Sequence, residues 1–132
     1  LGIHLHVARD REEAIANGAL ALSSQAEVFL RGRLSRPVQT EQIQTYASKS
    51  ASREAFEKLC TPEKARHAVA EEGTNVMAVW GTPDECVEKI KFYVDAMHPE
   101  QLMLNIASGS LAQDKVLQSM RLCAEKVLPA LR

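Results

Sequence analysis

One segment decides the fold expected for this chain, the run WGTPDECVEKI at positions 80–90. Thr82 is a natural helix N-cap, because its hydroxyl can accept a hydrogen bond from the unpaired amides of the first turn. Pro83 falls at the first helical position, where its missing N–H costs nothing. Glu85 completes a capping box with Thr82. A helix is therefore predicted from Pro83, and it presents an apolar stripe at helical spacing: Cys86, Val87, Ile90, Val94 and Met97.

Extended segments are predicted on both sides of this helix. Residues 75–80 (NVMAVW) form a brief extended piece that leads into it. The helix ends at about Met97, because the residue before Pro99 is pushed out of helical geometry. Residues 101–107 (QLMLNIA) then read as a buried strand. A last helix is expected over about 111–128, with side chains facing inward at Val116, Met120, Cys123 and Val127, beside Leu117, Ala124 and Leu128.

The chain opens on another predicted buried strand, GIHLHVA at residues 2–8. Side chains alternate along a strand, so His4 and His6 share one of its faces. The sequence begins at Leu1 without an initiator Met and enters this strand at once, which favours the back part of a longer protein.

A helix and a long polar stretch follow this strand. Asp10 is the expected N-cap, with Glu13 as its capping-box partner. Apolar residues at helical spacing continue this helix to about Arg31, and Gly32 is its expected stop. The stretch 37–74 is rich in Ser, Thr, Gln and Lys, and short helices are expected in it over 39–48, 51–60 and 62–72.

Composition indicates one ordinary globular domain. The 132 residues are 45% hydrophobic and 25% charged, and the net charge of -1 gives no electrostatic reason to bind nucleic acid or an anionic membrane. No apolar run is long enough to span a bilayer. The three cysteines, Cys60, Cys86 and Cys123, are odd in number and widely spaced, which favours a reduced, cytoplasmic protein over a disulfide or zinc framework.

The alternation of apolar strands with amphipathic helices predicts an α/β fold with parallel strands and crossover helices. The sequence offers about two strands. Two strands with open edges do not make a stable sheet. The remaining strands are therefore expected from an absent N-terminal part or from another chain.

Four segments carry a family resemblance: HLHVARDREEA at 4–14, GTPDECVEKI at 81–90, QLMLNIASG at 101–109 and LAQDKVLQSMRLCAEKVLPALR at 111–132. In this order and spacing they resemble the C-terminal part of the bacterial luciferase-like family of flavin-dependent monooxygenases. The resemblance implies that residues 1–132 are a helix-rich C-terminal fragment of a TIM (β/α)₈ barrel. Within it, 37–74 would be a helical excursion or mobile segment. A complete barrel needs about 250 residues, more than this chain has.

The resemblance also implies an activity. Such enzymes use reduced FMN and O₂ to oxygenate a small organic substrate, with a flavin reductase as the source of FMNH₂. Some branches of the family use a deazaflavin instead. Cofactor and catalytic contacts lie largely in the N-terminal part, so no catalytic residue is assigned and the fragment itself is expected to be inactive. The alternative is a non-catalytic helical module derived from the family that forms a homo-oligomer.

Three residues are candidate cofactor contacts. His6 is nearest the carboxyl end of its strand, where barrels gather their chemistry, and it is expected near a flavin or substrate. The alternative for His6 is a core histidine hydrogen-bonded to its neighbours. Ser108 and Gly109 could offer backbone amides to a phosphate, or could simply form a strand-to-helix turn with a Ser cap. Trp80 is expected to be a packing residue. No Gly-rich phosphate loop or metal-ligand spacing is present.

Overall fold

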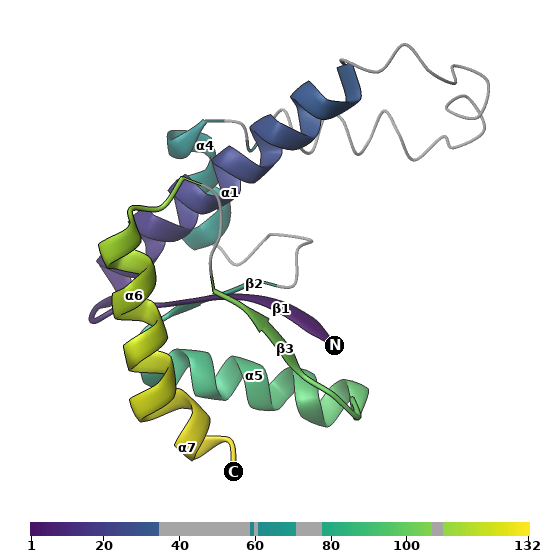
Figure 1. The fold of residues 1–132 in the computed structure, drawn as a ribbon, viewed down its shortest axis with the longest axis vertical. Coiled ribbons are helices and arrows are strands. Elements are labelled where there is room, and N and C mark those ends of the chain that lie inside the picture. The colour runs from purple at the N-terminus through teal and green to yellow at the C-terminus, as the bar shows by residue number, and fades with distance from the viewer. Residues whose placement is uncertain (35–58, 60, 71–77, 107–109) are drawn as a thin grey trace, which may run out of the picture.

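The computed structural model describes residues 1–34, 59, 61–70, 78–106 and 110–132. Its centre is a sheet of three parallel strands in the order β2-β1-β3 (Figure 1). The strands are β1 (Gly2–Val7), β2 (Ala78–Gly81) and β3 (Met103–Asn105). The helices are α1 (Arg11–Leu34), α4 (Pro62–Ala70), α5 (Pro83–Met97), α6 (Gln113–Leu122), the π-helix η1 (Cys123–Val127) and α7 (Leu128–Ala130). The predicted α/β class with parallel strands is confirmed.

The sheet holds one more strand than the sequence predicts. The extended piece expected at 75–80 is the strand β2 over Ala78–Gly81, which pairs with β1 from His4 opposite Ala78 to Val7 opposite Gly81. These four residues are too few to show the alternation typical of a strand. They form one because the backbone N–H and C=O groups of β1 are available to pair with theirs.

The third strand is much shorter and less buried than predicted. Of the described residues 101–106, Met103–Asn105 are strand, and the Met103 side chain is 66% exposed. The prediction of a buried strand is wrong here, because β3 lies at the edge of the sheet and pairs on one side only, with β1. Its apolar composition is that of a buried strand, but its position leaves one side open.

The capped helix α5 is as predicted. Thr82 accepts a hydrogen bond from the Glu85 N–H and the Glu85 carboxylate accepts one from the Thr82 N–H, at 3.5 and 2.9 Å. The helix ends at Met97, and His98 takes a left-handed conformation with φ 45° while its N–H bonds to Val94 O. Cys86 and Ile90 are fully buried, whereas Met97 at the end of the predicted stripe is exposed.

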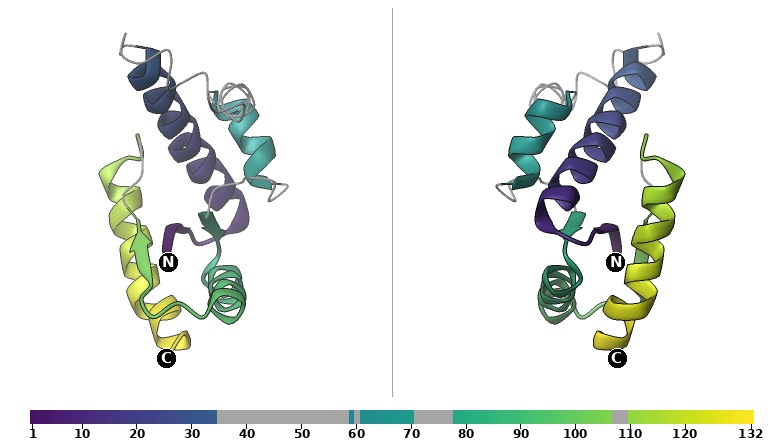
Figure 2. Two further views of the ribbon diagram at one scale, coloured as in Figure 1. Left: turned by 90° about the vertical axis from the view of Figure 1, so that its right-hand side faces the viewer. Right: turned by 90° about the vertical axis from the view of Figure 1, so that its left-hand side faces the viewer.

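Helices lie on both faces of the sheet. Side chains on one face of β1 pack with α5 and η1 in a core made of Ile3, Leu5, Val7, Val79, Cys86, Ile90, Cys123 and Val127. His4 and His6 point from the other face and contact α1. Figures 1 and 2 show α1 beside α4, with α5 beyond the strands from them and α6 running along the β3 side.

This arrangement differs from the order of strands in a closed barrel. Consecutive strands of a (β/α)₈ barrel are neighbours and its helices form one outer ring. Here β3 lies beside β1 rather than β2, and the two crossovers place their helices on opposite faces. The order β2-β1-β3 is instead the beginning of a doubly wound sheet.

The structure differs from the prediction at the end of α1, and it describes one of the three short helices expected in the polar stretch. Gly32 does not stop α1, which continues to Leu34. An isolated glycine weakens a helix by only about 1 kcal/mol, so it does not have to end one. In the polar stretch, the third expected helix is confirmed as Pro62–Ala70. The helices expected at 39–48 and 51–60 lie outside the described residues, except for Leu59, which is in a turn.

The last helix is interrupted by a π turn, which changes the side that it buries. Its buried row is Ser119, Cys123 and Val127, each four residues apart, whereas Met120 is 49% exposed. In a regular α-helix residues four apart drift by about 40° around the axis. The wider π turn, in which Leu128 N–H bonds to Cys123 O, counteracts that drift. The inward orientation predicted for Met120, and for Leu117, Ala124 and Leu128 beside it, is therefore wrong, because all four are exposed. The inward orientation of Cys123 and Val127 is confirmed, and Val116 is half-buried.

Ser119 joins this helix to the central strand. Its buried hydroxyl accepts a hydrogen bond of 2.8 Å from the Val7 N–H, past the last paired residue of β3. The hydroxyl thus replaces a strand carbonyl that β3 is too short to provide. Leaving a buried N–H without a partner is costly.

We expect Ser119→Ala to lower the free energy of unfolding by about 1–3 kcal/mol, because it leaves the Val7 N–H unsatisfied. Urea unfolding followed by circular dichroism measures this. Ser23→Ala is the control, since Ser23 is also buried, at 6% exposed, and its hydroxyl donates to Leu20 O of its own helix. Equal losses for the two variants would contradict the role given to Ser119.

Trp80 is a packing residue, as predicted. With Ile15 and Leu59 it borders a second buried cluster, Ala19, Leu22, Ala65 and Val69, which joins α1 to α4. The Trp80 ring lies so close to α1 that a Cβ added at Gly18 would come within 2.9 Å of it. Gly18 is therefore a contact point between α1 and β2.

We expect Gly18→Ala to destabilise the protein by about 1–3 kcal/mol through overpacking, although alanine favours a helix by about 1 kcal/mol. The fluorescence of Trp80, the only tryptophan, should shift in the same variant. Gly2→Ala is the control, because its added Cβ would meet only the flexible end of Met103 at 3.4 Å. A Gly18→Ala protein as stable as the parent chain would contradict this packing.

Candidate functional site

Polar side chains gather at the carboxyl end of β1, next to the first turns of α1 and α6. Ligands of parallel α/β folds bind at the carboxyl ends of the strands, in barrels and in doubly wound sheets alike. The residues concerned are His6 on β1, Glu13 and Asn17 on α1, and Lys115 on α6. We take these four as the candidate site.

His6 is the centre of this site. Only 2% of its surface is exposed, and its Nε2 accepts a hydrogen bond of 3.0 Å from the Asn17 side-chain amide. With Nε2 as acceptor, the neutral ring carries its proton on Nδ1. That Nδ1 is buried and has no hydrogen-bond partner among the residues that the structure describes. One buried donor is thus left unsatisfied.

An ion pair bridges α1 and α6 beside this histidine. Lys115 Nζ donates to Glu13 Oε1. Glu13 also lies in the first turn of α1, where its backbone N–H donates to the Asp10 carboxylate at 2.8 Å. The predicted N-cap at Asp10 is confirmed. The pair holds the beginnings of the two helices together across the end of β1.

The environment acts on the charges of all three ionisable groups. Burial lowers the pKa of His6, the negative charge of Glu13 partly opposes this, and Lys115 adds to it. The hydrogen bond from Lys115 lowers the pKa of Glu13, and the same bond raises the pKa of Lys115. The imidazole is thereby kept neutral beside a charged pair.

In chemical terms the arrangement holds a neutral imidazole in one orientation, with Asn17 on one nitrogen. The other nitrogen could donate a hydrogen bond to an acceptor atom. However, α1 lies against this face of β1, and His6 is almost completely covered. A flavin ring cannot contact His6 in this arrangement, so the residues present do not fit the cofactor and no flavin step is derived from them.

The other predicted residues have different outcomes. His4 lies on the same face as His6, as expected, and its Nδ1 is 3.4 Å from the side-chain amides of Gln25 and Asn105. The structure therefore brings His4 and His6 to the same helix, α1. Ser108 and Gly109 lie outside the described residues. The N-cap position of α6 is occupied by Ala112, whose side chain makes no capping hydrogen bond. The serine cap considered for this turn is therefore not present at α6.

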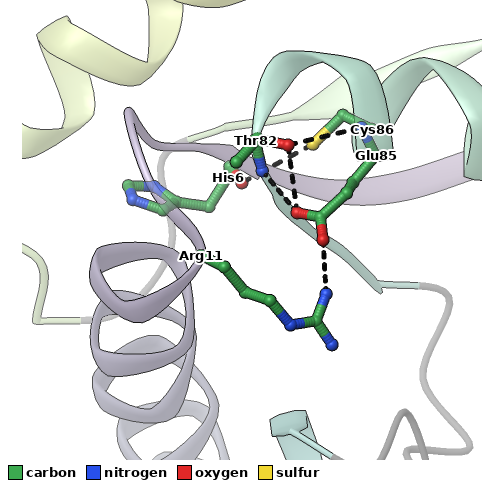
Figure 3. A network of polar contacts seen from close by, with 5 residues as sticks. All are labelled: His6, Arg11, Thr82, Glu85 and Cys86. Atoms are coloured by element: carbon green, nitrogen blue, oxygen red, sulfur yellow. Dashed lines mark hydrogen bonds and ion pairs between the residues drawn. The ribbon is translucent and has the colours of Figure 1, made fainter.

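A second polar network lies near the site and is structural. The Glu85 carboxylate accepts hydrogen bonds from the N–H and hydroxyl of Thr82, at 2.9 and 3.1 Å, and from Arg11 at 2.5 Å (Figure 3). Burial opposes ionisation of Glu85, but the Thr82 N–H and Arg11 outweigh it and lower the pKa of this carboxyl. The network ties the start of α1 to the start of α5.

The nearby thiol is not a nucleophile. Burial raises the pKa of Cys86 to about 12, and its Sγ is 4.0 Å from the His6 carbonyl oxygen (Figure 3). Only the thiolate attacks electrophiles, and a thiol with this pKa is almost fully protonated near neutral pH. Cys86 and Cys123 are both free and buried, and Cys60 lies outside the described residues.

Sequence reasoning missed three of the four site residues. Asn17 is a polar residue among apolar ones on the inner side of a helix, and that was a usable signal. Glu13 was identified only as a capping residue. Lys115 carried no signal, because its contact with Glu13 joins residues more than 100 positions apart.

Two comparisons with known proteins find no match to this chain. No model of a known protein family matches the chain, and a search of curated proteins finds no match. Among the described residues, no group of three or more His, Cys, Asp or Glu side chains could hold a metal ion. In the same part of the chain, every helix is too short or too polar to cross a membrane.

The lowered pKa of His6 predicts a loss of stability in mild acid. In the unfolded chain, His6 takes up a proton as the pH falls below 6.5, the ordinary pKa of histidine. The folded chain resists this uptake, because its His6 has a lower pKa. Stability should therefore fall below that pH, with a slope of up to about 1.4 kcal/mol per pH unit. Urea unfolding between about pH 7.5 and 5 measures the slope.

His6→Gln should remove most of this slope, because glutamine does not titrate. His67→Gln on the exposed side of α4 is the control and should retain the slope. A slope that is unchanged in His6→Gln would show that another group causes the acid sensitivity.

Proposed function

We propose that this chain is the C-terminal part of a luciferase-like flavin-dependent monooxygenase, which uses reduced FMN and O₂ to oxygenate a small organic substrate. The support is the resemblance of four segments, in order, over most of the described chain. The structure adds only the position of His6, which lies at the strand end where barrel enzymes place their chemistry. In the present arrangement α1 covers this residue, and no hydrogen-bond partner of its Nδ1 is found among the described residues.

The proposal requires a different arrangement in the complete enzyme. In a closed barrel β3 would pair with β2, and α1 would lie on the outer face of the barrel. The side of β1 that carries His4 and His6 would then line the interior. The isolated chain keeps α1 over this side, so we expect it to be inactive by itself.

The first experiment is the intact mass of the freshly purified gene product. A mass well above the 14.6 kDa of this chain identifies a longer parent on which activity can be tested. The parent should consume O₂ when FMN, NAD(P)H and a flavin reductase are supplied. A parent without flavin-dependent turnover, in the presence of a working reductase, would count against the proposal.

In that parent we expect His6→Ala to lower kcat/KM at least about tenfold, which corresponds to the loss of one hydrogen bond of about 1.4 kcal/mol. Oxygen uptake at several substrate concentrations measures this. His67→Ala, on the exposed side of α4, should leave kcat/KM unchanged. Equal effects of the two substitutions would exclude a specific role for His6.

A second candidate function is a non-catalytic interaction module. The observation that favours it is the arrangement itself. With the order β2-β1-β3 and helices on both faces, α1 covers His6 at the strand end where a ligand would otherwise bind. If the gene product has a mass of about 14.6 kDa, this function replaces the enzyme for this chain.

A further inference from the structure

One apolar surface of the chain remains unexplained by the core or by the candidate site. Leu117, Met120 and Leu128 are 45%, 49% and 43% exposed, and Ala124 between them is also exposed. All four lie on the outer side of α6, η1 and α7, turned away from the buried row at Ser119, Cys123 and Val127. We call Leu117, Met120, Ala124 and Leu128 the outer stripe.

The π turn brings Leu128 nearer to the side of Met120, in a stripe whose three- and four-residue spacing already follows one helical face. Leu117, Met120 and Ala124 follow the three- and four-residue spacing of one helical face. In a regular helix the next step of four, to Leu128, would drift about 40° further round. Because η1 takes more residues per turn, Leu128 stays on the same side as Met120. The same turn thus aligns the buried row and the exposed one.

The charges beside the outer stripe alternate along one of its flanks. Asp114, Arg121 and Glu125 are exposed on α6 and η1, and Arg132 follows just after α7. Cys123 is equally far in sequence from Arg121 and Glu125, and equally far from Asp114 and Arg132. An identical helix placed antiparallel and centred near Cys123 therefore brings each basic residue opposite an acidic one.

Other exposed apolar side chains lack this organisation. Phe92 is 68% exposed on α5, but its nearest ring contact is with Tyr93 of the same helix. Val28 is 69% exposed on α1. Leu20, Met97 and Met103 are exposed as well, on α1, α5 and β3. Among the side chains that the structure describes, the outer stripe is the exposed apolar row whose flanking charges are complementary to those of a second copy.

We propose that the outer stripe binds a second copy of this chain, with the two α6–η1–α7 segments antiparallel about a two-fold axis near Cys123. In such an interface the same patch is used on both subunits. Met120, Ala124 and Leu117 bury one another across the axis. Arg121 of each copy pairs with Glu125 of the other, and Asp114 pairs with Arg132. The proposal does not depend on flavin chemistry.

Sedimentation velocity of the 132-residue chain, over roughly 1–200 µM, tests the association. We expect a species of twice the 14.6 kDa chain mass. Met120→Lys places a charge in the centre of the stripe and should raise the dimer Kd by roughly 100-fold or more. Phe92→Lys is the matched control, since it adds the same charge at an exposed apolar position on α5 and should leave the Kd unchanged.

Charge reversal tests the antiparallel pairing itself. Arg121→Glu and Glu125→Arg should each weaken the homodimer, because each places like charges opposite one another. Mixed together, the two variants should form a heterodimer in which both cross-pairs are again complementary. Native mass spectrometry should find this heterodimer well above the half that random pairing gives.

Several results would overturn the proposal. One is a chain that stays monomeric over the whole concentration range. Another is a dimer with the same Kd in Met120→Lys as in the parent chain. The third is random pairing of Arg121→Glu with Glu125→Arg in their mixture. Circular dichroism and Trp80 fluorescence show whether each variant is folded. If Met120→Lys does not fold, the two charge variants still decide, because Arg121 and Glu125 are both exposed.

Discussion

The structure depends on β1, which has to be satisfied on four sides. Its two edges bond to β2 and β3, one face packs on α5 and η1, and the other meets α1. Where β3 ends, the Ser119 hydroxyl takes over the bond to the Val7 N–H. Because each helix is placed by its contact with this strand, the beginnings of α1, α5 and α6 come together at its carboxyl end.

That convergence explains why the candidate site and the structural networks are so close. The Glu13–Lys115 pair and the Arg11–Glu85 pair both tie helix beginnings together, and His6 lies beside the first of them. Both pairs are partly exposed, so they contribute little to stability individually. The Glu13–Lys115 pair also acts electrostatically on His6, because its two charges lie beside this buried neutral imidazole and influence its pKa.

The sequence predicted local features well and long-range ones poorly. The capping box at Thr82 and Glu85 and the end of α5 before Pro99 depend on a few adjacent residues, and both were confirmed. The shared face of His4 and His6 follows from strand geometry alone. The edge position of β3, the strand β2 and the exposure of Met120 depend on neighbours distant in sequence. The contacts of His6 with Asn17 and Lys115 have the same origin.

By itself, the sequence determined where α1 and α5 begin and that His4 and His6 share a face of β1, since these features follow from bonding within a few residues. It also predicted that His6 is nearer than His4 to the carboxyl end of its strand. Only the tertiary structure decided the strand order, the covering of His6 by α1 and the π turn that aligns the outer stripe. These three features are set by packing between segments far apart in the chain, where each must match the volume and unpaired backbone groups of the others.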